Sequence, residues 1–333
     1  MNTKRTPSTD LCALILAIGA SAMVSGCMPS APSSSTTGTS GKNIYVTQAS
    51  SVEIFPLTAS GNVAPSVTLG GVNAVFSQAH NLAFDANGNL YVTNAAADSI
   101  AVFAASPTSG ATPINTITGA ATGLGFPIGI AVDAQGNIYV TNDGDANNAN
   151  VYSVTVYPAG ATGNATPTAT ITGAATGLGS PNGIALDSHG NIYVANETGA
   201  SVTVYASGAT GNTAPTITIG GAATGLNQPQ GVVFDSTGKL YVSNGNGNSV
   251  TAYAAAASGN VTPTATIVGA ATGLSSPSGI ALDGNGNLYV ANESGGSVTV
   301  YPANTTGNTP PTAVISGVAT GLSAGTLQGV AIH

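Results

Sequence analysis

The sequence predicts an all-β protein, a six-bladed β-propeller with four antiparallel strands in each blade. The first observation is a repeated stretch, read as GIALDSHGNIYVAN at residues 183–196, with near-copies at 81–94, 129–142, 231–244 and 279–292. Its tyrosine recurs every 46 to 54 residues from Tyr45 to Tyr289. A strand-rich period of this length is typical of a propeller or a solenoid.

Each period contains four candidate strands. In the fourth period these are GIALD, NIYVAN, SVTVYAS at 201–207 and APTITIG at 214–220. Val, Ile, Thr and Tyr favour strands, and Gly, Asn, Asp and Pro separate them. The first two strands are almost wholly apolar, which indicates burial on both faces. The fourth alternates Thr with Ile, so we expect each blade to run from the axis to the rim.

The two ends of the chain favour a closed ring over an open stack. KNIYVTQ at 42–48 and GVAIH at 329–333 are the second and first halves of one repeat. An open solenoid would need polar caps at its ends. We therefore expect the last five residues to pair with the segment around Tyr45, completing a sixth blade and a propeller domain at 43–333.

The first 42 residues resemble a targeting signal. Lys4 and Arg5 precede the apolar run Leu11 to Ala20, which is too short to span a membrane as a mature helix. Small residues follow up to Cys27, as in the bacterial lipobox. We expect a lipoprotein signal peptide at 1–26 and an acylated Cys27 on a flexible Ser/Thr/Pro/Gly tether at 27–42. The alternative is an ordinary secretory signal with a chance cysteine.

The lipobox interpretation predicts location and charge together. It implies a lipid-anchored protein of the cell envelope, and the resemblance favours the outer membrane or cell surface because Met28, not Asp, follows the cysteine. Cleavage leaves Lys42 and Lys239 against eleven Asp and Glu, a net charge of 2 − 11 = −9. Such a charge disfavours nucleic acid and anionic lipid as partners. We expect a monomer whose membrane contact is made by the lipid alone.

The repeat aspartates are interpreted as turn residues. Each lies in the pattern D-x-x-G-[NK] between two strands, where Asp accepts backbone N–H groups and Gly takes the left-handed conformation. They are Asp85, Asp133, Asp187, Asp235 and Asp283. The pairs Gly163-Asn164, Gly211-Asn212 and Gly259-Asn260 are interpreted as hairpin tips. Strand alternation puts these turns on one face, so we expect the variable loops and any functional site on the other.

Two rings of side chains should point to that second face. The residue before the glycine of each first strand should line the mouth of the central channel: His80, Ile128, Asn182, Gln230, Ser278 and Gln328. The other ring ends each second strand: Gln48, Asn94, Asn142, Asn196, Asn244 and Asn292, followed in three blades by Asp143, Glu197 or Glu293. An amide ring can bind a polar ligand, or its members can cap loops. The candidate ligand-binding set is His80, Asn182, Gln230, Ser278, Gln328, Asn196, Glu197, Asn292 and Glu293.

One loop carries a cation-binding pattern. Asp143, Asp145 and Asn147 give the D-x-D-x-N start of a calcium loop, because hard cations prefer several oxygen ligands close in sequence. Asn148 and Val154 stand where the helical calcium motif has Gly and Glu. The alternative is a solvated polar loop without a metal. No other cofactor is indicated.

The repeat P-x-G-I-A-[VL]-D-x-x-G-N-[IL]-Y-V-[AT]-N, followed by S-V-T-V-Y, is similar to NHL-type repeats of six-bladed propellers. That family includes partner-binding domains, lactonases and lyases. Asn replaces its common Asp after the second strand, and its third-strand basic residue is missing, which disfavours RNA binding.

Catalytic groups are few, since His80, His189 and His333 should lie apart and no Ser-His-Asp set stands out. The first hypothesis is therefore a lipid-anchored, non-catalytic module that binds a protein or glycan through its loop face. The alternative is a divalent-metal-dependent lyase or lactonase that uses His80 with Glu197 or Glu293 at the channel mouth. A third possibility is a surface coat without a specific ligand.

Overall fold

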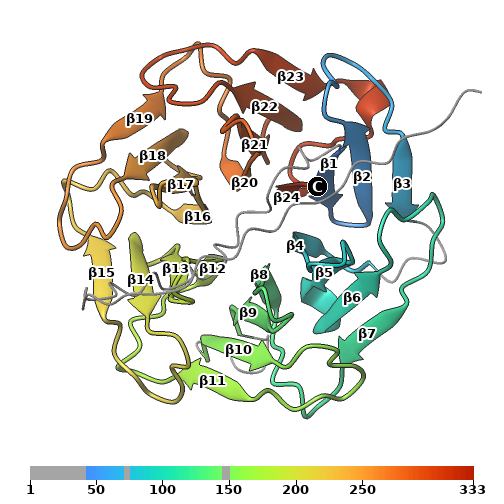
Figure 1. Ribbon diagram of the computed structural model, residues 1–333. Coiled ribbons are helices and arrows are strands. Elements are labelled where there is room, and N and C mark those ends of the chain that lie inside the picture. Colours follow the sequence, from blue (N-terminus) through green and yellow to red (C-terminus); the bar gives the residue numbers. More distant parts are fainter. Residues whose placement is uncertain (1–42, 71–75, 145–150) are drawn as a thin grey trace, which may run out of the picture. The chain divides into compact units, whose positions relative to one another are not determined.

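The structure, a computed structural model, describes residues 43–70, 76–144 and 151–333. These residues form six four-stranded antiparallel sheets arranged around a central axis (Figure 1). The predicted all-β, six-bladed propeller is confirmed. Apart from the strands, the described residues contain two short 3₁₀ segments, Ala95–Ala97 and Val318–Thr320. None of the helices in this described part is long and apolar enough to cross a membrane.

The strands of the first three blades follow one another from the axis outward. Blade 1 contains β24 (Leu327–Ile332), β1 (Asn43–Gln48), β2 (Ser51–Pro56) and β3 (Val67–Gly70). Blade 2 contains β4 (Ala79–Phe84), β5 (Leu90–Asn94), β6 (Ser99–Phe103) and β7 (Asn115–Thr118). Blade 3 contains β8 (Pro127–Val132), β9 (Ile138–Asn142), β10 (Ser153–Tyr157) and β11 (Ala169–Thr172).

The remaining blades repeat the same order. Blade 4 contains β12 (Pro181–Leu186), β13 (Ile192–Asn196), β14 (Ser201–Tyr205) and β15 (Ile217–Gly220). Blade 5 contains β16 (Pro229–Phe234), β17 (Leu240–Asn244), β18 (Ser249–Tyr253) and β19 (Ala265–Val268). Blade 6 contains β20 (Pro277–Leu282), β21 (Leu288–Asn292), β22 (Ser297–Tyr301) and β23 (Ala313–Ser316).

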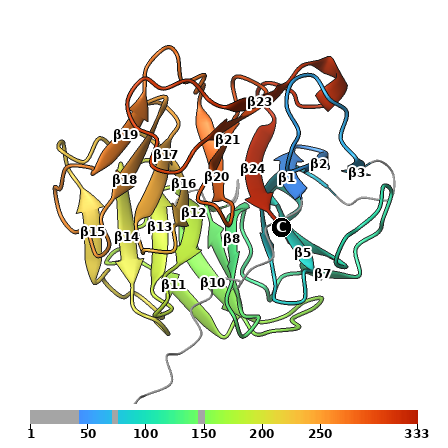
Figure 2. The ribbon, with the colours of Figure 1, turned by 45° about the horizontal axis from the view of Figure 1, so that its top comes forward.

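The last strand closes the ring as the split repeat predicts. β24 pairs antiparallel with β1, placing Ile44 opposite Ile332 and Val46 opposite Val330. The N–H of Asn43 donates to the carbonyl of His333 at 2.9 Å, and the N–H of His333 donates back at 3.1 Å. Figure 2 shows β24 and β1, from opposite ends of the chain, side by side. This pairing removes the free edge that an inner strand would otherwise expose.

The first strands meet around the axis because small residues let their backbones approach. Each first strand packs against those of both neighbouring blades, and β24 contacts both β20 and β4. A Cβ atom built on Gly279 would lie 2.7 Å from the backbone oxygen of Gln328 in the next first strand. Glycine is therefore required where the strands converge. In blade 2 Asn81 occupies this position.

Burial across a blade differs from the expected gradient. The second and third strands are the most deeply buried, and β13 and β18 are buried along their full length. The first strands are partly exposed, because one side faces the central axis. Each fourth strand buries one residue of four, such as Ile219 of β15. The core thus lies between blades, in six apolar clusters built mainly from second and third strands.

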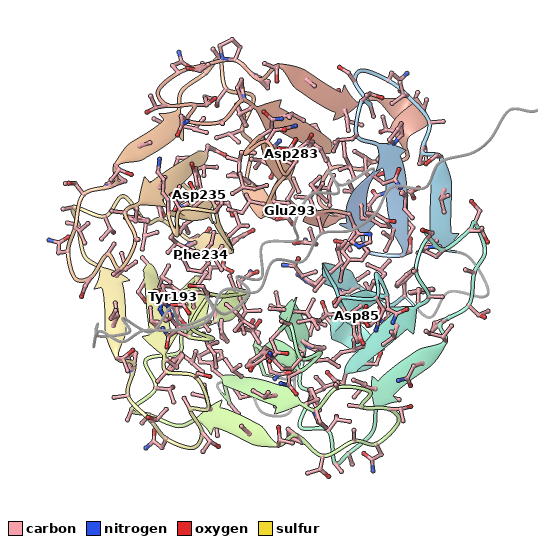
Figure 3. The ribbon with its side chains drawn as sticks, in the orientation of Figure 1. Asp85, Tyr193, Phe234, Asp235, Asp283 and Glu293 are labelled. Carbon is pink, nitrogen blue, oxygen red and sulfur yellow. The ribbon has the colours of Figure 1, made fainter. Side chains whose placement is uncertain are left out.

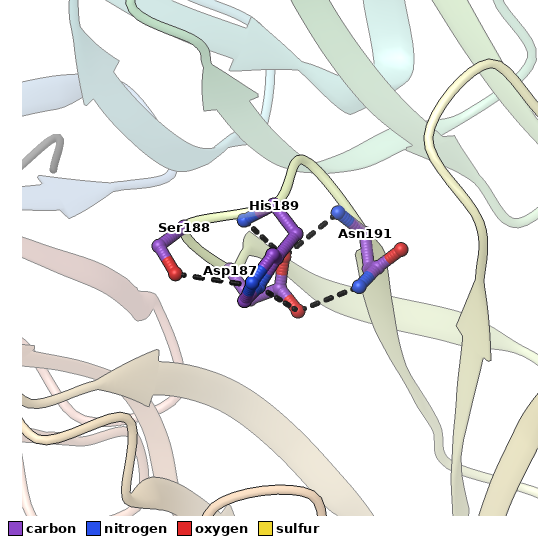
Figure 4. Close-up of polar contacts among 4 residues, drawn as sticks. All are labelled: Asp187, Ser188, His189 and Asn191. Atoms are coloured by element: carbon purple, nitrogen blue, oxygen red, sulfur yellow. Dashed lines mark hydrogen bonds and ion pairs between the residues drawn. The ribbon is translucent and has the colours of Figure 1, made fainter. Parts of the chain in front are cut away.

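The D-x-x-G-[NK] segments are turns, as predicted. In blade 4 the Oδ1 of Asp187 accepts the backbone N–H groups of His189 and Asn191, both at 2.9 Å. Its Oδ2 accepts the side-chain amide of Asn191 at 2.8 Å (Figure 4). Gly190 has a φ of 78°, in the left-handed region. Because internal donors take up both carboxylate oxygens, this aspartate is structural.

The expectation that this turn face carries only tight turns is wrong. The connection between the third and fourth strands of blade 3 occupies residues 158–168, and it reaches the neighbouring blade. Its Asn164 accepts the N–H of Ala121 at 2.7 Å, and Gly163 pairs with Ile117 of blade 2 in a parallel bridge. The Gly-Asn pair therefore joins blades as well as shaping a loop.

Candidate functional site: the channel mouth

The backbone at the rim of the channel mouth has residues in the left-handed conformation, which is strained for residues other than glycine. In five blades a non-glycine residue with φ between 46° and 53° precedes the first strand: Gln78, Phe126, Ser180, Gln228 and Ser276. The carbonyl of each accepts the N–H of the residue that follows the second strand, as in the Glu197 to Ser180 bond of 3.1 Å. Residues in this region cost free energy and cluster at functional sites. Sequence reasoning missed this feature, because these five residues share no side-chain chemistry.

The amides that end the second strands are buried caps. Asn196 and Asn292 are 0% exposed. The Oδ1 of Asn196 accepts the N–H of Gly179 at 3.1 Å, and its Nδ2 donates to Thr203 at 3.0 Å. Asn292 bonds Ser275 and Thr299 in the same way, both at 3.1 Å. These contacts favour the capping alternative over ligand binding for both residues.

Five candidate residues directly precede the glycine position of a first strand, and four of them converge on the axis. His80, Asn182, Ser278 and Gln328 line a small space together with Asn81 and the backbone of Gly231 and Gly279. Its free volume is about that of one water molecule. The side chain of the fifth candidate, Gln230, lies instead against the backbone of Gly245. A Cβ atom built on Gly245 would be 2.9 Å from its Nε2. Ile128, the apolar member of the ring, is 6% exposed.

His80 is the basic group of this space. Its ring packs edge-on against Phe126, with centroids 6.0 Å apart. Burial lowers the pKa of His80 to about 4, because desolvation penalises the imidazolium form. Within the part of the chain that the structure describes, no residue hydrogen-bonds its ring nitrogens. The imidazole is therefore neutral near pH 7 and able to accept a proton.

Three carboxylates surround the mouth. Asp143, Glu197 and Glu293 take equivalent positions after the second strands of blades 3, 4 and 6. Burial raises the pKa of Glu197, and the charges of Asp143 and Glu293 raise it further, while the amide of Asn182 opposes them. Burial also raises the pKa of Asp143, while a hydrogen bond with Ser180 opposes the shift. Glu293 accepts a bond from Nε2 of Gln328 at 3.2 Å, and Figure 3 shows it toward the axis of the ring.

The predicted calcium loop is only partly described, because Asp145 and Asn147 lie outside the described residues. Asp143 itself lies at the mouth, and its Oδ1 is buried without a hydrogen-bond partner among the described residues. Across 43–70, 76–144 and 151–333, no three His, Cys, Asp or Glu side chains come together as a possible metal site. The mouth acids are instead spread around the rim, and Glu197 and Glu293 each have an amide neighbour. This donor set does not form a single metal site.

A ring of hydroxyls beneath the rim links neighbouring blades. The Oγ1 of Thr141 accepts the N–H of Gly129 at 2.7 Å and donates to the carbonyl of Asn182 in the next blade at 2.6 Å. Thr47, Thr93 and Ser243 make equivalent bonds. Blades 4 and 6 have Ala195 and Ala291 instead. These two blades also carry the rim glutamates, a correlation visible in the repeated sequence V-A-N-E.

The chain belongs to a family of propeller proteins described as the SMP-30/gluconolactonase/LRE-like region, whose profile matches residues 19–224. A second profile, described as a seven-bladed β-propeller lactonase, matches residues 212–323. The present ring has six blades, so the second match does not extend to blade number. A search of curated proteins finds no match.

Solved structures with the same architecture are distant in sequence. A protein of unknown function from Bacteroides caccae is 12% identical, with a TM-score of 0.62 over 87% of this chain and 98% of that one. A chain from a nidogen/laminin complex is 19% identical, with a TM-score of 0.59 over 87% and 97%. A functionally unknown protein from Desulfotomaculum acetoxidans is 12% identical, with a TM-score of 0.54 over 86% and 98%. At these identities the likeness supports the fold alone.

Proposed function

We propose that the protein is a hydrolase of small cyclic esters, with its reaction centre at the channel mouth. Membership of a family described by gluconolactonase, and the partial match to lactonases, favour the earlier alternative, a divalent-metal-dependent lyase or lactonase, over the non-catalytic binding module. The present proposal keeps the lactonase reaction of that alternative and replaces its metal with His80. The observation that carries the proposal is His80, a half-buried neutral imidazole beside a space of about one water molecule.

The proposed reaction consumes one water and opens one ring. His80 takes a proton from a water in that space while the water oxygen bonds to the lactone carbonyl carbon. The ring C–O bond then breaks, and the imidazolium returns the proton to the leaving alkoxide. The product is a hydroxy acid, whose carboxyl group then ionises.

We assign stabilisation of the oxyanion to the amides of Asn182 and Gln328, which line the same space as His80. Each NH₂ group has two N–H donors, so Gln328 keeps one free while the other bonds Glu293. Donors aimed at a developing oxyanion typically contribute a factor of about 10²–10³ to the rate. No step is routed through a metal, because the acids among the described residues do not come together as one site.

The test is proton release from a panel of γ- and δ-lactones, sugar lactones included, with and without EDTA and Ca²⁺. We expect turnover that EDTA does not abolish and that His80→Ala lowers by about 100-fold or more. His189→Ala is the matched control, because His189 is exposed in a turn on the other face. Full activity in His80→Ala would contradict the proposal. Absence of turnover on every lactone would contradict the hydrolase proposal and favour the partner-binding module. Turnover that depends on Ca²⁺ would contradict the metal-free reaction and indicate a metal-assisted one.

We further propose that Cys27 carries the lipid anchor and that the propeller works at the cell envelope. The support is the sequence pattern of residues 1–27. Incorporation of a labelled fatty acid into the protein, lost in Cys27→Ser, would support the proposal. A Cys27→Ser protein that is still labelled and still sediments with membranes would contradict it.

A further inference from the structure

The acids of the channel mouth have no basic partner among the residues that the structure describes. Between residues 43 and 333 the sequence has one Lys or Arg, Lys239. Lys239 lies in the turn between β16 and β17, on the face opposite the mouth, with its Nζ 5.2 Å from the ring centroid of Tyr241. Within residues 43–333, no Lys or Arg therefore balances the charge of the three mouth carboxylates.

The fold holds these acids at one level. The N–H groups of Asp143, Glu197 and Glu293 donate to the carbonyls of Phe126, Ser180 and Ser276 at 3.0 to 3.2 Å. The same backbone bond in blades 2 and 5 is made by Ala95 and Gly245. The acids are thus attached to a fixed rim, and the rim forms without them. Their presence in three blades is not needed for the backbone geometry.

Two further observations point to a ligand at this place. One oxygen of Asp143 is buried without a partner among the described residues. The half-buried imidazole of His80 lies at the wall of the axial space, with no described residue bonded to its nitrogens. Buried polar groups are normally paired, so an open carboxylate oxygen close to an unbonded imidazole favours a partner other than the described residues.

We propose that the molecule bound at the channel mouth carries an alkylammonium group, which the carboxylates of Asp143, Glu197 and Glu293 recognise. This inference rests on the proposed function, for which it selects amine-bearing lactones over neutral or anionic ones. An ammonium group suits the site because one cation can face several carboxylates through three N–H donors without requiring them to converge as metal ligands. The acidic product would be repelled by the same charges, which favours its release.

The test is equilibrium binding of cyclohexylammonium chloride to the full-length protein, with cyclohexanol as the neutral ligand of the same ring size. Binding does not depend on turnover, so this result is independent of the hydrolase proposal. We expect the ammonium ligand to bind at least about 10-fold more tightly than the alcohol, and added salt to weaken it. Glu197→Gln and Glu293→Gln should each lower its affinity by about 5-fold or more.

Asp235→Asn is the matched control, since it removes one negative charge from a turn on the opposite face and Asn also supports such a turn. Affinity should be unchanged in this variant. Equal binding of the alcohol, no binding of either ligand, or an equal loss in Asp235→Asn would overturn the inference. Displacement of the ammonium ligand by Ca²⁺ that requires all three mouth acids would also overturn it, because the acids would then serve a metal.

Discussion

The hydroxyl of Tyr157, at the end of β10, donates a hydrogen bond of 2.6 Å to the backbone carbonyl of Thr122 in the crossover that leads from blade 2 into blade 3. Tyr205, Tyr253 and Tyr301 make the same bond to Thr176, Thr224 and Thr272, all at 2.6 Å. Blades 1 and 2 have Phe55 and Phe103 at this position, both fully buried, and in blade 1 Thr320 stands at the place of the acceptor. The tyrosine hydroxyl that makes this bond is therefore missing from two blades, and one of them is the blade that closes the ring.

Phe55→Tyr should restore this bond and raise the free energy of unfolding by about 1 kcal/mol, a typical net value for one hydrogen bond. Thermal or urea unfolding measures the change. Tyr157→Phe is the reverse control and should lower stability by about 1–2 kcal/mol, because it leaves a buried carbonyl unpaired. A destabilised Phe55→Tyr protein would show that blade 1 has no room for the hydroxyl.

The Asn residues of the outer hairpins should hold neighbouring blades together through one acceptor atom. Asn212 Oδ1 accepts the N–H of Ala175 at 2.7 Å, and the side chain lies over Gly173. Asn212→Ala should lower the free energy of unfolding by about 1 kcal/mol, whereas Asn212→Asp, which keeps the acceptor, should lose much less. Urea unfolding of the two variants decides the matter. Equal losses of unfolding free energy in the two variants would mean that the Oδ1 acceptor does not stabilise the contact between the blades.

Ala195→Ser should complete the hydroxyl ring in blade 4. In blade 5 the Oγ of Ser243 accepts the N–H of Gly231 at 2.7 Å and donates to the carbonyl of Ser278. The same hydroxyl at position 195 should bond Gly183 and Gln230 and stabilise the fold by about 1 kcal/mol. Ser243→Ala should show a loss of similar size. A fall in melting temperature for Ala195→Ser would show that blade 4 does not follow blade 5 at this position.

The titration of His80 should appear in the pH dependence of stability. Its folded-state pKa is about 4, against an ordinary 6.5. Between these values the unfolded chain binds a proton that the folded protein does not, so the free energy of unfolding should fall as pH drops from about 6.5 to 4. The loss should reach up to about 3 kcal/mol. His80→Gln should remove this component.

The comparison with His80→Gln is necessary because other groups titrate nearby. Asp143 and Glu197 have raised pKa values, so their protonation favours the folded state as the pH falls. That contribution has the opposite sign and should remain in the variant. Urea unfolding from pH 4 to 8 gives the difference between the two proteins. Parallel stability curves would contradict a lowered pKa for His80.

The sequence was sufficient to predict the ring, its blade number and its closure. Six copies of the repeat indicate six blades, and one of these copies is divided between the two ends of the chain. It also predicted the Asp187 turn, whose chemistry is local. It could not separate capping from binding for Asn196, since both use the same amide and only burial distinguishes them. Nor could it show that Gln230 turns away from the axis while Gln328 does not, since both occupy the same repeat position.

The mutual hydrogen bonds of Asn43 and His333 place the two ends of the propeller next to each other. The chain could therefore begin at a different blade and still form the same ring. A short linker from 333 to 43, with new ends opened in the crossover between β11 and β12, should give a circular permutant that folds to the same ring. Such a protein would begin with an intact blade and contain no blade assembled from both ends, so it would separate the contribution of ring closure from that of the blades themselves.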